Sequence, residues 1–247
     1  MTPMRIHFIG TGDAFGSGGR GQTCIRIETP SARVLLDCGA TALEGMNRTG
    51  IATNTIDAVL VSHLHGDHFG GLPFFLLEAQ LHSRRSRPLL IAGPPGVQAR
   101  VRAAQEVLFP GSSGMDYRFR TDFVELPERR PVDICGLQVT AYPVSHGSGA
   151  PSFALRVEHG GRVFAYSGDA EWSESLPEAA DGADLFVCEA YFFDKPMKYH
   201  LNYRTLLEHR SSLNCRRLLM THMSTDLLAR LSEVELETAA DGLVVDL

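Results

Sequence analysis

The stretch "HLHGDHFGG", residues 63–71, places three histidines and one aspartate within six positions. It directly follows "DAVLVS" (57–62), a run with the composition of a strand. Imidazole and carboxylate groups bind transition metals, and one tetrahedral ion cannot easily take all four side chains from so short a loop. The spacing therefore predicts a centre in which two metal ions share the loop.

Three further candidate ligands end other predicted strands: His146, Asp169 and His222. The ends of neighbouring strands meet at one edge of a sheet, where loops vary on a rigid scaffold. We therefore expect these three side chains to converge on the loop at 63–71.

The seven candidate ligands divide into two groups and a bridge. His63, His65 and His146 are expected to hold one ion, and Asp67, His68 and His222 the second. Asp169 is expected to bridge both through its two carboxylate oxygens. A ligand set without thiolate favours zinc, with manganese or iron as alternatives. Two such ions make a shared hydroxide available near neutral pH.

The bulk composition limits the partners of the chain. Among 247 residues the net charge is −6, so no global basic field attracts nucleic acid. The five cysteines are odd in number and lack Cys-x-x-Cys spacing, which argues against a disulfide framework. We expect each cysteine to be buried on or beside a strand in a reducing cytoplasm. The sequence shows neither a signal peptide nor an apolar run long enough to span a membrane.

Apolar runs bounded by Gly, Asp or Pro predict strands at 5–10, 23–29, 33–39, 57–63, 88–93, 137–146, 152–159, 162–169, 184–190 and 217–222. Gly160-Gly161 predicts a hairpin between two of them. Helices are predicted at 40–49, 71–83, 95–108, 202–212 and 224–237. The pattern indicates an α/β fold with helices covering sheets. Because no linker divides the chain, residues 1–247 are expected to form one domain.

The ordered set of ligands resembles that of the metallo-β-lactamase superfamily. Its pattern is His-x-His-x-Asp-His followed by three later ligands, and all seven positions are matched. The resemblance implies a four-layer αβ/βα sandwich, with two mixed sheets, helices outside and a dinuclear site at one edge. The superfamily performs several chemistries on these ligands, so the fold does not name the substrate.

Finer features resemble the ribonuclease Z group: "FIGTGDAFGSGGRGQTC" (8–24), "SGDA" (167–170), "EAY" (189–191), "KYHLNY" (198–203) and "THMS" (221–224). By this resemblance His200 is the acid that protonates the leaving oxygen. Glu189 assists it, and Asp67 lies near the attacking hydroxide. Asp67, Glu189 and His200 are thus the expected catalytic residues.

The chain also departs from that group. The long arm that grips tRNA is missing, because only residues 147–168 separate His146 from Asp169. The favoured prediction is therefore a phosphodiesterase for a small cyclic or nucleotide-like phosphodiester. Ribonuclease Z-type processing of tRNA 3′ ends is the first alternative, with RNA as the partner. A lactone or ester hydrolase, and a metal-dependent sensor without activity, are further alternatives.

Other segments allow a structural and a functional interpretation. The glycine-rich "GTGDAFGSGG" (10–19) is expected to line the site, with Asp13 bracing a ligand histidine. The cluster Arg84–Arg87 and the pair Arg129-Arg130 could contact phosphate, but solvated turns are favoured. The aromatics around His200 could stack on a base or pack a lid. The apolar helix near 72–82 fits core packing or a homodimer interface.

Overall fold

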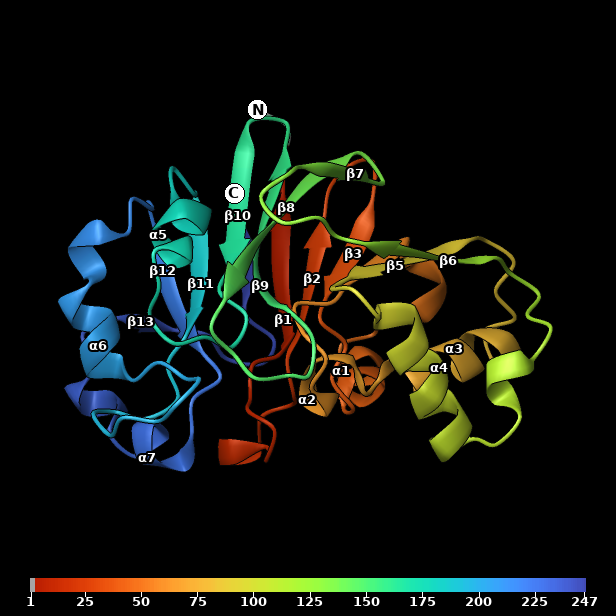
Figure 1. Ribbon diagram of the computed structural model, residues 1–247, viewed down its shortest axis with the longest axis horizontal. Coiled ribbons are helices and arrows are strands. Elements are labelled where there is room, and N and C mark those ends of the chain that lie inside the picture. Colours follow the sequence, from red (N-terminus) through yellow and green to blue (C-terminus); the bar gives the residue numbers. More distant parts are fainter. Residues whose placement is uncertain (1–2) are drawn as a thin grey trace.

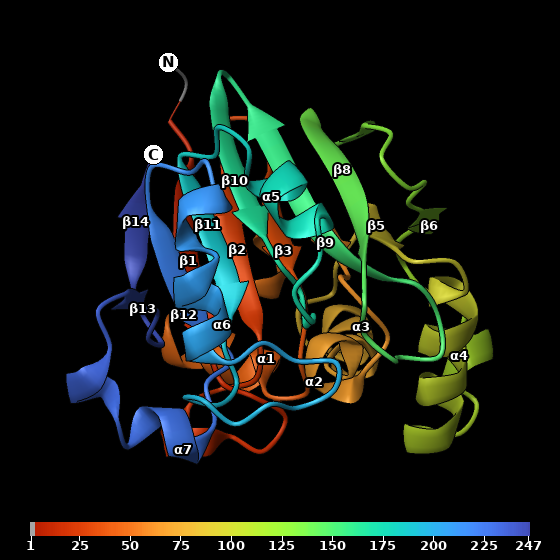
Figure 2. The same cartoon turned by 60° about the vertical axis from the view of Figure 1, so that its left-hand side comes forward.

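Two seven-stranded sheets packed face to face form the centre of the molecule, and helices cover both outer sides (Figure 1). The structure is a computed structural model and describes residues 3–247. Figure 2 shows the same layers after a rotation, with the strands of the second sheet in front of those of the first. The four-layer αβ/βα sandwich that the sequence resemblance implied is confirmed.

The first sheet has the strand order β14-β1-β2-β3-β4-β5-β6. β14, β1, β2 and β3 pair in antiparallel fashion, whereas β3 to β6 run parallel. Its strands are β1 (Arg5–Gly10), β2 (Cys24–Glu28), β3 (Arg33–Leu36), β4 (Ala58–Leu60), β5 (Leu89–Gly93), β6 (Thr121–Glu125) and β14 (Val244–Asp246).

The second sheet has the order β13-β12-β11-β10-β9-β8-β7. β7 to β10 are antiparallel and β10 to β13 are parallel, so both sheets are mixed. Its strands are β7 (Val132–Ile134), β8 (Leu137–Val144), β9 (Ser152–His159), β10 (Arg162–Tyr166), β11 (Leu185–Glu189), β12 (Leu218–Thr221) and β13 (Glu237–Thr238).

The helices divide between the two outer faces. The first sheet is covered by α1 (Ala42–Arg48), α2 (Gly66–Phe69), α3 (Leu72–Leu81) and α4 (Val97–Leu108). The second is covered by α5 (Ser175–Ala180), α6 (Tyr203–Glu208) and α7 (Thr225–Leu228). Because β3 to β6 and β10 to β13 are parallel, their connections must cross from one strand end to the other, and helices make most of these crossings.

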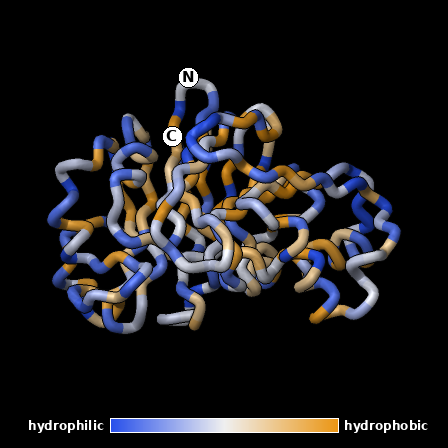
Figure 3. The backbone as a smooth tube through the Cα atoms, in the orientation of Figure 1, coloured by the Kyte–Doolittle hydropathy of each residue, from blue (hydrophilic) through white to orange (hydrophobic). Residues whose placement is uncertain are grey.

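Alternation along the strands builds the layers. In β1, Ile6 and Phe8 face the core between the sheets, while Ile9 faces the helical layer. In β9, Phe153 and Leu155 face the core between the sheets, and Ala154 packs toward α5. The central strands are therefore buried on both faces. This explains why their sequences are nearly continuous apolar runs. Figure 3 shows this as hydrophobic colour along the central strands and hydrophilic colour on the outer loops.

All ten predicted strands are present, and the hairpin at Gly160-Gly161 joins β9 to β10 as expected. Four strands were not predicted: β6, β7, β13 and β14. They are short or rich in charge, and sheet pairing rather than local composition creates them. The helix predicted at 224–237 is wrong beyond Leu228. A 3₁₀ turn at Leu231–Glu233 follows, and β13 then joins the second sheet beside β12.

The five cysteines are unpaired, as expected. Cys24, Cys38 and Cys188 are completely buried in strands or beside them. The expectation of full burial is wrong for Cys135 and Cys215, which are only partly buried. Cys135 lies in the turn between β7 and β8, and Cys215 lies before β12, where neither sheet covers the chain completely.

Candidate metal centre

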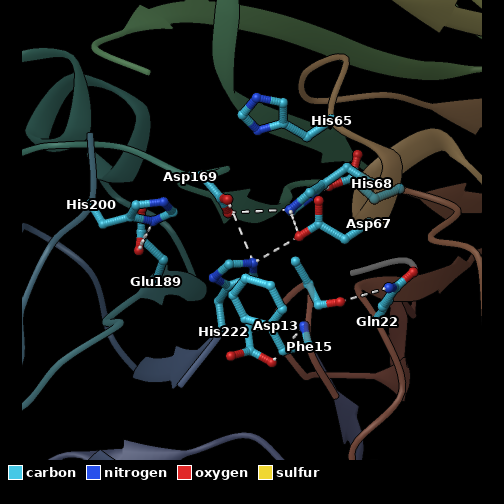
Figure 4. A network of polar contacts seen from close by, with 12 residues as sticks. Asp13, Phe15, Gln22, His65, Asp67, His68, Asp169, Glu189, His200 and His222 are labelled. Atoms are coloured by element: carbon cyan, nitrogen blue, oxygen red, sulfur yellow. Dashed lines mark hydrogen bonds and ion pairs between the residues drawn. The ribbon is translucent and has the colours of Figure 1, made fainter. Parts of the chain in front are cut away.

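The seven predicted ligands meet at one end of the two sheets, where α2 follows β4. Figure 4 shows His65, Asp67, His68, Asp169 and His222 among them. Their donor atoms fall into overlapping groups whose members lie within 4.8 Å of one another. One group holds His63, His65 and His146, and another holds Asp67, His68, Asp169 and His222. His200 belongs to two further groups, one with His146 and Asp169 and one with Glu189 and His222. The first two groups resemble the grouping expected from the spacing, except that Asp169 lies in only one of them. None of the other histidines, His7, His82, His159 and His209, joins a cluster of this kind among the described residues.

The local backbone explains how a short loop can present four side chains. His63 and His65 lie in the extended segment after β4, whereas Asp67 and His68 belong to the single-turn helix α2. Gly71 ends this loop beside the segment after β3. A Cβ on Gly71 would lie 2.2 Å from the carbonyl oxygen of Gly39, so only glycine permits this approach.

Three residues near the cluster hold a left-handed backbone conformation without being glycine. The φ angles are 59° at Asp37, 73° at Tyr199 and 59° at His222. Such angles cost free energy in L-residues other than glycine and concentrate at functional sites. In His222 the conformation is held by its backbone N–H, which donates to the Thr11 carbonyl oxygen at 3.1 Å.

Each histidine of the first group, and His68, uses one ring nitrogen to bind a neighbour. Nδ1 of His146 donates to the Tyr199 carbonyl at 2.8 Å, and Nε2 of His65 donates to the Gly147 carbonyl at 3.1 Å. Nδ1 of His63 lies 3.1 Å from the Ser62 hydroxyl oxygen. A hydrogen bond on one nitrogen fixes the tautomer and leaves the lone pair of the other available to a metal.

His68 has the strongest such support. Its Nδ1 donates to Oδ2 of Asp37 at 2.7 Å, and Asp37 also accepts from the Ser62 backbone N–H and hydroxyl. The sequence analysis did not predict Asp37, which lies inside the strand predicted at 33–39 and follows the observed strand β3 directly. The expectation that Asp13 braces a ligand histidine is wrong. Asp13 accepts from the Phe15 N–H and from Ser17 instead.

Several polar atoms at the centre are buried without a hydrogen-bond partner among the described residues. They include Nε2 of His63, Nε2 of His68 and Oδ1 of Asp169. Buried polar atoms are normally paired, so a group of lone pairs in one place requires a ligand. Nitrogen and carboxylate donors with fixed tautomers suit divalent metal ions, and the donor set therefore fits them.

Asp169 lies between the two groups. Its carboxylate oxygens are 3.3 Å from Nε2 of His68, 3.5 Å from Nε2 of His222 and 3.9 Å from Nε2 of His146. Burial alone would raise the pKa of Asp169, but the charges of His222 and His68 hold it well below its ordinary value. Burial opposes the charged form of His222, yet Asp169 and Asp67 raise its pKa to about 9. The buried carboxylates thus favour positive charge at this point.

His200 lies next to the ligands and is held by Glu189. Nδ1 of His200 donates to Oε2 of Glu189 at 3.1 Å, and the backbone N–H of Ala170 donates to the other carboxylate oxygen. The His200 ring centroid is 5.0 Å from that of His146, and the ring stacks at 5.9 Å on His222. Glu189 is completely buried, so the pair is a fixed element of the site.

A pocket of about 140 Å³ opens over the cluster. Its polar residues are His65, Asp67, Asp169, His200 and His222, and its other walls are Ala14, Phe15, Tyr191 and Met197. The glycine-rich segment therefore lines the site, as expected. Phe15 was not singled out from the sequence. Its large apolar side chain stands between Ala14 and Gly16 in a polar turn, and this unusual position could have identified it.

The arginines proposed as phosphate contacts do not line this pocket. Arg85 is buried and donates only to backbone carbonyls. For this residue both interpretations, a phosphate contact and a solvated turn, are therefore wrong. Arg87 pairs with Asp57, and Arg129 pairs with Glu178. Of the aromatics around His200, only Tyr191 lines the pocket, whereas Phe193 and Tyr203 are buried in the core under the second sheet.

Comparisons with known proteins show the family of the chain. The family model described as Beta-lactamase superfamily domain matches residues 32–223. Ribonuclease Z of Methanothermobacter thermautotrophicus is 26% identical over 287 residues, covering 96% of this chain and 91% of that protein. Ribonuclease Z of Agathobacter rectalis is 24% identical over 277 residues, covering 91% and 89%.

Solved structures show the same fold. The short form of human tRNase Z has a TM-score of 0.78 at 25% identity, with 98% of each chain covered. A diphosphatase from the PhnP family has a TM-score of 0.78 at 18% identity, with 100% of this chain and 98% of that one covered. In the described residues no helix is long and apolar enough to cross a membrane. The chain belongs to the beta-lactamase superfamily, and it is a metal-dependent hydrolase of that fold.

Proposed function

We propose that this protein is a dinuclear zinc phosphodiesterase that cleaves a small cyclic or nucleotide-like phosphodiester. The observation that carries the proposal is the His200–Glu189 pair. His200 lines the same pocket as the ligands. It lies within reach of His146, Asp169 and His222, but its Nδ1 is bound to Glu189. An imidazole placed there, with Nδ1 held by a buried carboxylate, suits protonation of a leaving oxygen.

The seven ligands take the roles that the sequence spacing gives them. Asp169 groups with Asp67, His68 and His222. Its Oδ2 also lies 3.8 Å from Nε2 of His63 and 3.9 Å from Nε2 of His146, which supports a bridging role. Divalent ions held by these side chains would polarise the phosphoryl oxygens and make hydroxide available near neutral pH. Asp67 faces the pocket and orients the attacking group. Glu189 keeps Nδ1 of His200 protonated, so Nε2 is the nitrogen that gives its proton to the leaving oxygen.

A small substrate is favoured over a folded RNA. The segment between His146 and Asp169 is a loop followed by the β9–β10 hairpin and carries no protruding arm. The pocket is small, and the net charge of the chain is −6. A large polyanion would gain little from such a surface, because sequence-independent RNA binding depends on clustered basic side chains.

The test compares two esters that differ in their need for an acid. In 2′,3′-cyclic AMP the leaving group is an alkoxide, whereas in bis(p-nitrophenyl) phosphate it is a stabilised phenolate. His200→Ala should lower kcat for the cyclic nucleotide by about 10²- to 10⁴-fold and for the aryl ester much less. Metal content, measured by mass spectrometry, should stay unchanged.

His209→Ala is the matched control, because His209 stacks on Trp172 away from the ligands. It should leave both activities unchanged. Loss of the metals in His200→Ala would show that His200 is a ligand instead of an acid. Failure of the metal-loaded wild type to cleave either ester would reject the phosphodiesterase.

Processing of tRNA 3′ ends is the second candidate. It is favoured by the curated relatives named Ribonuclease Z, which align along nearly the whole chain. The candidate predicts specific cleavage of a precursor tRNA at the 3′ end of the mature sequence. Indifference to precursor tRNA, with cyclic nucleotides cleaved, would decide for the small substrate.

A further inference from the structure

The glycine-rich segment before β2 exposes an aromatic side chain at the mouth of the pocket. Phe15 is 83% exposed, the highest value for any large apolar side chain in the described residues. Its side chain lines the same pocket as Asp67, Asp169 and His222 (Figure 4). An exposed phenylalanine beside a catalytic cluster is a candidate anchor for the organic part of a substrate.

Hydrogen bonds with the side chains of Asp13 and Gln22 fix the backbone of the segment that carries Phe15. Buried Asp13 accepts from the Phe15 N–H at 3.2 Å, the Ser17 N–H at 2.9 Å and the Ser17 hydroxyl at 2.7 Å. The side-chain amide of Gln22 donates to the Ala14 carbonyl at 3.0 Å. These bonds fix the backbone of Phe15 without covering its side chain.

A second anchor fixes the base of the same segment. Asp241 accepts from the N–H and hydroxyl of Thr11 at 2.9 and 2.7 Å, and from the Gly21 N–H at 2.7 Å. The loop is therefore ordered before any ligand arrives. A preorganised aromatic loses little conformational entropy when a ligand packs on it, which strengthens binding.

A second exposed apolar side chain lines the pocket. It is Met197, which is 44% exposed. Lys195 and Lys198, on either side, are the only lysines in a chain that otherwise uses arginine. Their ammonium groups lie 4.9 and 4.6 Å from the ring centroids of Phe192 and Tyr199.

We infer that Phe15 and Met197 form a subsite for a nucleobase, so that the substrate is a nucleotide ester and not a simple alkyl phosphodiester. The inference rests on the proposed phosphodiesterase function. The pocket of about 140 Å³ holds the phosphodiester, and the base extends outward across Phe15. Stacking on an aromatic face accepts every base, so the subsite selects nucleotides without selecting one base strongly.

The experiment compares two cyclic phosphodiesters that differ in the base. 2′,3′-Cyclic AMP has one, and glycerol 1,2-cyclic phosphate has the same five-membered ring without it. Hydrolysis by the zinc-loaded full chain is followed by phosphorus NMR. Phe15→Leu should lower kcat/KM for cyclic AMP by about 5- to 100-fold and leave the glycerol ester within about twofold. Phe15→Tyr, which keeps the aromatic face, should retain the wild-type preference.

Binding of adenosine 3′-monophosphate, measured by calorimetry, gives a readout besides turnover. Phe15→Leu should weaken it by a similar factor, whereas inorganic phosphate should bind equally to both proteins. Phe74→Leu is the control, because Phe74 is a partly exposed phenylalanine on α3 outside the pocket.

The outcomes separate the two proposals. Equal loss on both esters in Phe15→Leu, or no loss on either, overturns the nucleobase subsite and leaves the phosphodiesterase in place. If the wild type hydrolyses neither ester, the proposed function fails and the subsite fails with it. A selective loss on the cyclic nucleotide supports both.

Discussion

Two groups of buried polar side chains lie at opposite ends of the parallel strands β4 and β5, and their polar atoms are satisfied to very different degrees. At the carboxyl ends, the ligand cluster leaves Nε2 of His63 and His68 and Oδ1 of Asp169 without hydrogen-bond partners among the described residues. At the amino ends, the guanidinium of Arg85 donates to the carbonyls of Thr53, Ile56, Arg87 and Pro88.

The contrast distinguishes a binding site from a structural element. Arg85 is 1% exposed, and each of its nitrogens donates to a backbone carbonyl oxygen. Its cluster is complete within the chain and needs no ligand. The metal cluster is preorganised by Asp37, Tyr199 and Gly147, but its inward-facing atoms remain open to a cation. Burial alone therefore does not identify function, whereas buried unpaired donors of one chemical kind do.

The largest expected effect is on the shared ligand. Asp169→Ala removes the carboxylate that lies between both groups, so metal content should fall and turnover should drop to background. Metal analysis after dialysis and the cyclic nucleotide assay check this. Asp181→Ala, at an exposed aspartate beside Asn214, should change neither. Full retention of both metals in Asp169→Ala would contradict the bridging assignment.

Metal removal should destabilise the protein. Ions that bind only the folded chain stabilise it by about 3 kcal/mol when present at a hundred times Kd. Chelation should therefore lower the urea midpoint, and added zinc should restore it. An unchanged midpoint would mean that the cluster does not bind metal in the folded state.

Arg85→Met should lower the stability of the fold without changing the metal content. The change leaves backbone carbonyls unpaired in a buried position, and we expect the free energy of unfolding to fall by about 3 kcal/mol. Metal content should equal that of the wild type, and chelation should lower the midpoint by the same amount as before. Arg84→Met, at the exposed neighbouring position, is the control and should cost well under 1 kcal/mol. Metal loss in Arg85→Met would show that the two clusters are coupled.

Asp37→Asn should produce the smallest change, because it alters only the support of one ligand. Asn can still accept from Ser62, but its side chain carries no charge to fix the ring of His68. We expect zinc affinity at one of the two sites to fall by about 10- to 100-fold, measured by competition with a chromophoric chelator. Asp133→Asn, at an exposed position in β7, should leave affinity unchanged. Equal affinities in Asp37→Asn and wild type would show that the hydrogen bond does not support metal binding.

Much of this molecule can be predicted from sequence because the deciding features are local. The strands of the sandwich interior are continuous apolar runs, and His63, His146, Asp169 and His222 each follow such a run within a few residues. The strands that precede them, β4, β8, β10 and β12, are not neighbours and lie in two sheets. The packing of the two sheets therefore brings the ends of these strands together. Short charged strands such as β6 carry no local pattern of this kind and were missed.

Contacts between distant segments decided the rest. Hydrogen bonds to Asp37, Tyr199 and Gly147 determine which ring nitrogen of His68, His146 and His65 faces the cluster. The sequence spacing around residue 63 does not predict these partners. The burial of Arg85 depends on carbonyls that the chain brings together only after folding. Residue type sets donor character, so the sequence alone identified the groups that are able to bind a metal. Only the tertiary structure decided their orientation and the exposure of Phe15, because both depend on partners far away in the chain.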